Sequence, residues 1–453
     1  MTDWSITSLN TSIAGGVSCE SLVATALEKA RDGEGPRVFR MLRAEEAMVV
    51  ACAADLLRAR GAHAPPLAGL PISIKDNIDI KGEVSAAGSK ALLETSSPAE
   101  RDAPVIARVR AAGAAIVGRT NLSEFAFHGI GTNPHFGTPA NAFDRLARRV
   151  PGGSSAGAAI SVTDRMAVAA LGTDTGGSVR IPAALNGLVG FKPTKRRVST
   201  EGVVPLSTTL DCVGPLATCV ADCAFLDSIL SDNASVMGAP ETRALRFALP
   251  EEFMLAGADQ IVQRVFERCV RQLRDAGAVV DTMASGVFDA SRRMAERGSL
   301  SQAEVWERFG SLIAARRDDI DPYVAQRIER GASMSAADYI ANLRERAEFI
   351  RTLDALTASF NAVLAPTVPI VAPRISEVDN LENFTHTNLL LLRNPAIANL
   401  ADRPSISIPC HAPGEPPVGL MLIGHTMQDE RLLATAAAVE RILPNSGSHW
   451  PAR

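Results

Sequence analysis

The sequence predicts an α/β protein built on a sheet whose strands come from both ends of the chain. An apolar run at 70–74 ends at Lys75 and has the length of a short buried strand. A helical segment at 101–112 and a second apolar run at 114–117 follow it, and this order is typical of α/β sheets. A further strand-like run lies at 188–191, and others return late in the chain, at 362–365, 405–409 and 419–423. We therefore expect one fold and not two tandem domains.

The segment at about 245–360 differs from its surroundings. Arginine becomes frequent there, glycine becomes sparse, and apolar residues recur with a helical period, as in DQIVQRVFERCVRQLRDAG. We expect a helical insertion or cap within a single domain that spans residues 1–453.

Composition and charge exclude several classes of protein. The 453 residues carry 46 basic and 50 acidic side chains, a balance that gives no basic surface for nucleic acid. No apolar run is long enough for a membrane span, and the N-terminus has no signal-peptide pattern. The seven cysteines include no CxxC pair, which argues against a zinc site or a disulfide framework. We expect a cytoplasmic protein that contacts neither nucleic acid nor membrane and holds no metal.

Two glycine-serine clusters lie between residues 150 and 190, at 152–155 and 176–178. In the second cluster, Gly176 and Gly177 precede Ser178 and a helix is expected to follow. Backbone N–H groups of Thr175, Gly176, Gly177 and Ser178 would then converge on an oxyanion, with the Ser178 hydroxyl exposed as a nucleophile. The alternative is a plain turn with Ser178 as a helix N-cap.

A serine nucleophile needs a base, and Lys75 is the candidate. No histidine stands in a hydrolase-like motif and no GxSxG elbow is present. A neutral lysine requires its pKa to fall from about 10.4 to near neutrality, at a cost of about 4.6 kcal/mol. Burial at the end of an apolar strand lowers lysine pKa values by that amount. The alternative is a surface lysine at a strand end.

Ser154 is the candidate for a hydroxyl that relays the proton between Ser178 and Lys75. Gly152 and Gly153 before it allow an unusual backbone, including a cis peptide bond. A phosphate-binding loop is the alternative, but neither a P-loop nor a GxGxxG pattern is present. Asp174 and Arg180 flank Ser178, and we interpret them as a buried ion pair that holds the turn.

Taken together, these motifs resemble the amidase signature family. The resemblance covers most of the chain and is strongest over the core region 66–224. The two serines are 24 residues apart, which matches the family spacing. The matching segments are PLAGLPISIKDNIDIKG (66–82), GRTNLSEFA (118–126), PGGSSAGAA (151–159), GTDTGGSVRIPAALNGLVGFKPT (172–194), LDCVGPLATCVADCA (210–224), VLAPTVP (363–369) and VGLMLIG (418–424).

The resemblance implies a Ser-cisSer-Lys triad on an α/β/α sandwich around a large twisted mixed sheet. Ser178 is then the nucleophile, Ser154 the bridging serine next to a cis peptide, and Lys75 the base. The supporting residues would be Ser155, Asp174 and Arg180. The implied reaction is hydrolysis of a carboxylic amide through an acyl-enzyme, releasing ammonia or an amine, without a cofactor.

In the resembled family the segment Ala126, Phe127, His128 lines the acyl pocket, which makes His128 a candidate substrate contact. The alternative is an ordinary loop histidine. The sequence departs from the family pattern at Ala156, Ala158, Asp402 and His411, and the last two bear on a substrate-facing loop.

Two functions fit these motifs. A stand-alone amidase acting on a small-molecule amide is favoured by the mildly acidic composition and by the departures at Asp402 and His411. The glutaminase subunit of a tRNA-dependent amidotransferase shares every segment quoted above. An inactive scaffold is disfavoured because Lys75, Ser154 and Ser178 are all present. A homodimer is left open, and the sequence does not specify which amide is the substrate.

Overall fold

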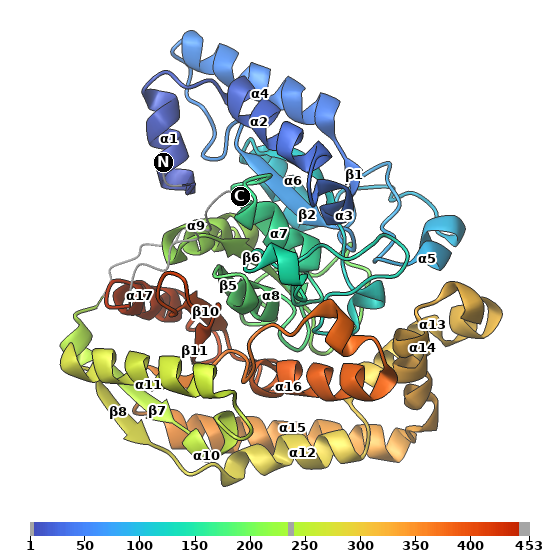
Figure 1. The fold of residues 1–453 in the computed structure, drawn as a ribbon, viewed down its shortest axis with the longest axis vertical. Helices are drawn as coiled ribbons and strands as arrows, with labels where there is room; N and C mark the ends of the chain where they lie inside the picture. Colours follow the sequence, from blue (N-terminus) through green and yellow to red (C-terminus); the bar gives the residue numbers. More distant parts are fainter. Residues whose placement is uncertain (1–3, 234–239, 444–453) are drawn as a thin grey trace.

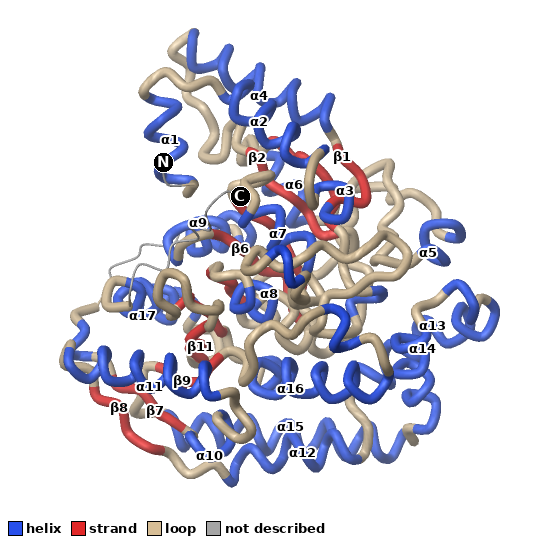
Figure 2. The backbone as a smooth tube through the Cα atoms, viewed as in Figure 1, coloured by secondary structure: helices blue, strands red, loops and turns tan. Residues whose placement is uncertain are grey.

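A mixed sheet of 11 strands runs through the molecule. Its labelled strands lie between the helices in Figures 1 and 2. The computed structural model describes residues 4–233 and 240–443. In spatial order the strands are β1 (Phe39–Leu42), β3 (Ala115–Thr120), β2 (Pro71–Lys75), β4 (Ala169–Asp174), β6 (Cys212–Ala217), β5 (Val189–Lys192), β10 (Ser405–Pro409), β11 (Gly419–Ile423), β9 (Ala362–Pro366), β7 (Arg246–Leu249) and β8 (Val279–Thr282).

The sheet has two halves that come from the two parts of the chain. Strands from residues 39–217 form one half, and strands from residues 246–423 form the other. The halves join where β5 and β10 pair antiparallel, with Ser405 opposite Lys192. The predicted strands of the late part therefore belong to the same sheet as the early ones.

Helices cover both faces of the sheet (Figure 1). The α-helices are α1 (Ile6–Ala14), α2 (Cys19–Arg31), α3 (Gly35–Val38), α4 (Ala44–Ala59), α5 (Lys90–Thr95), α6 (Pro104–Ala111), α7 (Ala156–Thr163), α8 (Arg180–Leu185), α9 (Val220–Ser231), α10 (Glu251–Met254), α11 (Gln260–Asp275), α12 (Asp289–Glu296), α13 (Leu300–Ala315), α14 (Pro322–Glu329), α15 (Ala336–Thr357), α16 (Leu381–Leu400) and α17 (Asp429–Glu440). No helix within residues 4–233 and 240–443 combines the length and the apolar character that crossing a membrane requires.

Alternation along β2 shows how the two faces differ. Ile72 and Ile74 point into the large apolar core that also contains residues of α6, α9, α11 and α17. Ser73 points the other way, and its hydroxyl lies 2.8 Å from that of Ser161 in α7. Successive side chains of a strand face opposite sides, so Lys75 lies on the α7 side with Ser73. The protein is thus an α/β/α sandwich around a mixed sheet.

Five strands were not expected from the sequence. β1, β4 and β6 lie outside the predicted strands, and β7 and β8 lie inside the segment expected to be helical. β6 contains Gly214 and Pro215, which are uncommon inside strands, although all six of its residues are buried between β4 and β5. β7 and β8 have four residues each, too few to stand out between long helices. They extend the sheet beyond β9, with parallel pairing to their neighbours.

Candidate active site

The three residues expected to form a triad come from three segments that end at one edge of the sheet. Lys75 is the last residue of β2, and Ser178 follows β4 in the turn that leads to α8. β2 and β4 pair parallel, with Ile74 opposite Leu171, so their C-terminal ends lie together. Ser154 lies in the loop before α7.

The Lys75 ammonium group is buried and bonded only to uncharged oxygens. Its Nζ donates to Ser154 Oγ at 2.7 Å and to Thr173 Oγ1 at 2.8 Å. Burial lowers the pKa of Lys75 to about 7, and the negative charges of Asp174 and Asp211 oppose that shift. No carboxylate of the described residues lies within ion-pair distance of Nζ. A lysine in this setting exchanges a proton near neutral pH.

The loop before Ser154 is held by the segment at 123–131. The Gly153–Ser154 peptide bond is cis, at the side of Ser154 where the sequence allows it. The Gly153 N–H donates to the Gly129 carbonyl at 2.7 Å, and the Ser123 N–H donates to the Ser154 carbonyl at 3.2 Å. A Cβ at position 153 would lie 2.7 Å from the Gly131 nitrogen, so this position has room only for glycine.

Ser178 is 4% exposed and lies beside the Ser154 loop. The Ser155 N–H donates to the Ser178 carbonyl at 3.2 Å, which ties the two glycine-serine clusters together. The Ser155 hydroxyl donates to the Thr173 carbonyl at 3.4 Å. Ser155 therefore connects both serines to the end of β4.

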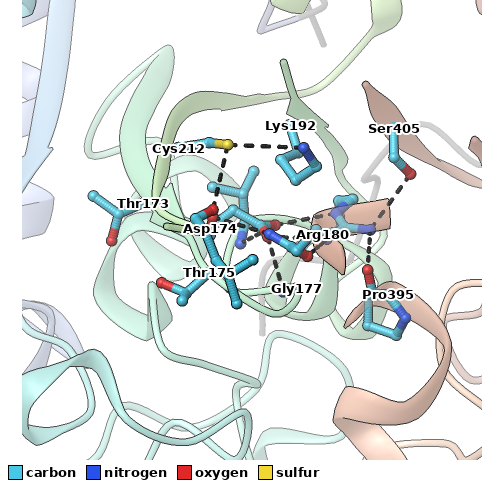
Figure 3. A network of polar contacts seen from close by, with 12 residues as sticks. Thr173, Asp174, Thr175, Gly177, Arg180, Lys192, Cys212, Pro395 and Ser405 are labelled. Carbon is cyan, nitrogen blue, oxygen red and sulfur yellow. Dashed lines mark hydrogen bonds and ion pairs between the residues drawn. The ribbon is translucent and has the colours of Figure 1, made fainter. Parts of the chain in front are cut away.

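Asp174 and Arg180 form the buried ion pair that the sequence suggests (Figure 3). Arg180 Nη2 donates to Asp174 Oδ1 at 2.9 Å, and both side chains are fully buried. Asp174 remains ionised, because Arg180 holds its pKa well below the ordinary value despite the opposing effect of burial. Arg180 also donates to the Pro395 carbonyl at 2.9 Å, as Figure 3 shows. The pair thereby fixes the turn after β4 against α16.

The same aspartate engages part of the turn backbone. The Gly177 N–H donates to Asp174 Oδ1 at 2.8 Å. The expectation that this N–H faces an oxyanion is therefore wrong, because the carboxylate already accepts it. The N–H groups of Thr175, Gly176 and Ser178 donate to no other group of residues 4–233 and 240–443.

The segment Ala126, Phe127, His128 lies against the Ser154 loop and is buried, with exposed fractions of 4%, 3% and 2%. Burial lowers the pKa of His128 to about 3, so its ring is neutral at physiological pH. The histidine is thus not an exposed loop residue, and its Nε2 has no hydrogen-bond partner among the described residues.

Four residues around the site were not singled out from the sequence. The Thr173 hydroxyl accepts from Lys75 and from Asn77 Nδ2, the latter at 3.1 Å. Asn399 Nδ2 donates to Asp174 Oδ1 at 3.0 Å. Asp211 accepts a 2.5 Å hydrogen bond from the Thr175 hydroxyl, and burial raises its pKa to about 6. Thr173, Asn77 and Asp211 stand within the matched segments, whereas Asn399 lies in a helix that carries no local signal of a site.

Asp402 and His411, which depart from the family pattern, both have side chains that accept backbone hydrogen bonds. Asp402 has a left-handed backbone, with φ of 52°, at a position where the family pattern usually has glycine. Its carboxylate accepts from the Lys195 N–H at 3.1 Å. His411 is buried, which lowers its pKa to about 4, and its Nδ1 accepts from the Val418 N–H at 3.5 Å. In the described residues, no group of three or more His, Cys, Asp or Glu side chains is arranged to hold a metal ion.

Comparison with known proteins gives consistent matches over nearly the whole chain. The family model described as Amidase matches residues 22–433. The chain is 34% identical over 400 residues to the 2-amino-5-chloromuconic acid deaminase of Comamonas testosteroni, covering 87% of this chain and 86% of that protein. It is 35% identical over 444 residues to a glutamyl-tRNA(Gln) amidotransferase subunit of Lacticaseibacillus paracasei, covering 89% of each.

Solved structures agree with the sequence matches. A crystal structure of an amidase superposes with a TM-score of 0.85 at 31% identity, covering 95% of this chain and 97% of that one. The corresponding glutamyl-tRNA(Gln) amidotransferase subunit of Thermotoga maritima superposes with a TM-score of 0.78 at 29% identity, covering 95% and 93%. The chain therefore belongs to the amidase family and is a hydrolase of amide C–N bonds.

Proposed function

We propose that the protein is a stand-alone amidase whose nucleophile is Ser178 and whose base is Lys75, acting through Ser154. In the first step Ser178 Oγ attacks the amide carbonyl carbon. Its proton passes to Ser154 Oγ while the Ser154 proton passes to neutral Lys75 Nζ. The resulting ammonium returns a proton through Ser154 to the leaving nitrogen, the C–N bond breaks, and an acyl-enzyme remains. Water then cleaves the ester with the same groups as base and acid.

One observation carries this proposal: a buried, unpaired lysine lies 2.7 Å from the hydroxyl of Ser154. A structural lysine gains stability from a carboxylate partner or from solvent, whereas Lys75 is buried and has no carboxylate partner within the described part of the chain. Its lowered pKa, about 7, gives it a neutral fraction at physiological pH. This is the property that a proton acceptor for serine requires.

The negative charge of the tetrahedral intermediate needs donors that are fixed beforehand. We assign this role to the N–H groups of Thr175, Gly176 and Ser178, which no described residue accepts. Asp174 and Arg180 hold the turn so that these groups need not reorganise during the reaction.

Replacing Ser178 by alanine is expected to abolish turnover, because the acyl-enzyme cannot form. A panel of simple primary amides assayed for ammonia release measures this loss, and a fluorophosphonate probe reports whether Ser178 reacts as a nucleophile. Ser228→Ala is the matched control, since it removes a serine hydroxyl outside the site that donates to the Phe225 carbonyl at 2.7 Å. It is expected to retain both turnover and labelling. Full activity in Ser178→Ala with an intact fold would exclude Ser178 as the nucleophile.

The second candidate, a glutaminase subunit, is supported by the similarity to the amidotransferase subunits. The match to a 2-amino-5-chloromuconic acid deaminase supports an enzyme that acts on a small acid instead. Ammonia release by the purified chain from simple amides, with glutamine left intact, would support the stand-alone amidase. Glutamine hydrolysis that requires partner subunits would support the alternative. A cytoplasmic location and a single functional domain remain part of this proposal.

A further inference from the structure

Three buried side-chain nitrogens beside the segment 127–129 have no hydrogen-bond partner among the described residues. They are His128 Nε2, Asn388 Nδ2 and Arg327 Nε. A buried polar group without a hydrogen-bond partner lowers the stability of the folded state by about 1–3 kcal/mol. Three such groups beside one short segment therefore require an explanation. Arg327 Nε and Asn388 Nδ2 are hydrogen-bond donors, and His128 Nε2 is a donor when it carries the ring proton.

His128 is neutral, because burial, together with the charge of Arg327, lowers its pKa to about 3. The Ser123 hydroxyl donates to the His128 carbonyl at 3.1 Å and lies 3.2 Å from Nδ1. The Gly131 N–H lies 3.4 Å from Nδ1 in a donating position. In the tautomer in which Nδ1 accepts from Gly131, Nε2 carries the proton and is a donor without a partner among the described residues.

The guanidinium of Arg327 reaches this place from α14. Its central carbon lies 4.7 Å from the centre of the Phe127 ring. The Arg327 guanidinium forms no ion pair and no hydrogen bond with any residue in 4–233 or 240–443, and the residue keeps part of its surface exposed. Tyr323, one turn earlier on α14, packs on Phe384 of α16 with ring centres 4.7 Å apart. This contact links the helix of Arg327 to that of Asn388.

The amide of Asn388 reaches the same place from α16. Its Oδ1 accepts from the Gly129 N–H at 2.8 Å, which leaves Nδ2 as the free end. Phe384, one turn earlier on α16, packs edge-on against the His128 ring with centres 5.1 Å apart. The three donors are thus fixed around residues 127–129 by α14, α16 and the loop itself.

This cluster lies next to the reacting serines. The carbonyl of Gly129 accepts from the N–H of Gly153, the residue before Ser154, at 2.7 Å. The cluster therefore borders the loop that carries Ser154, and the Ser155 N–H of that loop donates to the Ser178 carbonyl at 3.2 Å. Three donors, one of them permanently cationic, match a carboxylate, which accepts hydrogen bonds at both oxygens.

We propose that the acyl part of the substrate carries a carboxylate bound by Arg327, His128 and Asn388, so that the substrate is a monoamide of a short dicarboxylic acid. This inference rests on the proposed function, because it places the carboxylate on the acyl side of Ser178.

Matched substrates of equal length test the inference. Succinamate and glutaramate carry the carboxylate, whereas succinamide and glutaramide replace it with a neutral amide. We expect kcat/KM to favour each acid over its diamide by at least about 100-fold, the order of effect of leaving a buried charge unpaired. Arg327→Met is expected to lower kcat/KM for the acids by about 100-fold, mostly through KM, and to change the diamides by less than about threefold.

Control variants separate the subsite from general damage. Arg330→Met removes an exposed charge from the residue where α14 ends and is expected to retain the preference for acids. His128→Phe keeps an aromatic ring against Phe384 but removes the donor, and about a tenfold loss is expected for the acids only. Equal losses on acids and diamides in Arg327→Met, or a wild-type preference for diamides, would overturn the subsite.

A binding measurement distinguishes failure of the subsite from failure of the proposed chemistry. Thermal unfolding of Ser178→Ala with succinate or glutarate should show stabilisation that Arg327→Met removes and that the dimethyl esters do not produce. Absence of this stabilisation overturns the subsite even if amides are hydrolysed. Stabilisation without hydrolysis of any amide retains the subsite and overturns the proposed function. Glutamine is added as a probe: if it is hydrolysed as well as glutaramate, the site tolerates an α-amino group and the glutaminase alternative gains support.

Discussion

Lys75 illustrates how burial alone creates a reactive side chain. Its position at the end of β2 removes it from water, and its partners are the hydroxyls of Ser154 and Thr173. Neither partner carries a charge that would stabilise the ammonium form. The pKa of Lys75 therefore falls to about 7, even though Asp174 and Asp211 lie close enough to oppose the shift.

The proton state of Lys75 predicts the pH dependence of activity. The neutral amine is the active form, so kcat/KM should rise about tenfold per pH unit below pH 7 and level off above it. Lys75→Arg keeps a cation that cannot lose its proton, and a loss of about 10³-fold is expected. A pH–rate profile and the Lys75→Arg rate measure this. A rate independent of pH between about 5 and 9, or an active Lys75→Arg variant, would remove Lys75 from the mechanism.

At the scale of elements, α7 lies unusually close to its neighbours because it is built from small residues. A Cβ at Gly157 would lie 2.5 Å from the Val38 carbonyl oxygen and 2.8 Å from the Asn121 backbone. The Gly157 N–H donates to the Asn121 carbonyl at 3.0 Å. This close approach positions the start of α7, and hence Ser154, against the strands that carry Lys75.

Gly157→Ala is expected to destabilise the protein, although alanine is the better helix former by about 1 kcal/mol. Overpacking against backbone atoms costs about 1–3 kcal/mol and cannot be relieved by a rotamer change. Urea unfolding and the rate of amide hydrolysis should both show the loss. Gly286→Ala is the control, because a Cβ there meets nothing within 4 Å, and its unfolding free energy should change by less than about 0.5 kcal/mol. A stabilised Gly157→Ala would contradict the close approach.

At the scale of the whole molecule, the site depends on contacts between the two halves of the sheet. Asp174 belongs to the first half, yet its carboxylate accepts from Asn399 in α16 of the second. The last helix, α17, also returns to the first half: Glu440 accepts from the Val220 N–H at the start of α9 at 2.9 Å. Burial raises the pKa of Glu440 from its ordinary value near 4.5 to about 7.

This carboxyl group gives stability a defined pH dependence. The folded state holds the Glu440 proton more tightly than the unfolded state, so its contribution is complete below pH 4.5 and is lost as pH rises through 7. Glu440→Gln fixes the neutral form and keeps the acceptor for Val220. We compare the unfolding free energies of Glu440→Gln and wild type at two pH values. The variant minus wild-type difference should be about 1–2 kcal/mol more favourable at about pH 8 than at about pH 4.5. Urea unfolding at both pH values measures this.

The control for Glu440→Gln is Glu267→Gln, on the exposed side of α11. The unfolding free energy of Glu267→Gln should differ from that of wild type by the same amount at both pH values. If the difference in unfolding free energy between Glu440→Gln and wild type also stays constant with pH, that result would show that folding does not raise the pKa of Glu440.

Much of the central fold was predictable from local patterns. The apolar runs that became β2, β3, β5, β9, β10 and β11 stand between turn residues, and burial on both faces makes such runs uniformly apolar. The strands that escaped prediction were those with short or mixed sequences, β1, β4, β6, β7 and β8. Their pairing partners, and not their own residues, make them strands.

The sequence by itself determined the local chemistry: which serines and which lysine are present, the glycines that let Ser154 and Ser178 take their turns, and the family to which the chain belongs. Only the tertiary structure decided that Gly177 donates to Asp174, and that Asn399 reaches the same carboxylate from α16. It likewise placed Arg327, His128 and Asn388 beside the segment 127–129. The physical reason is that these contacts join distant parts of the chain, and a hydrogen bond between such residues leaves no periodic trace in the sequence of either partner.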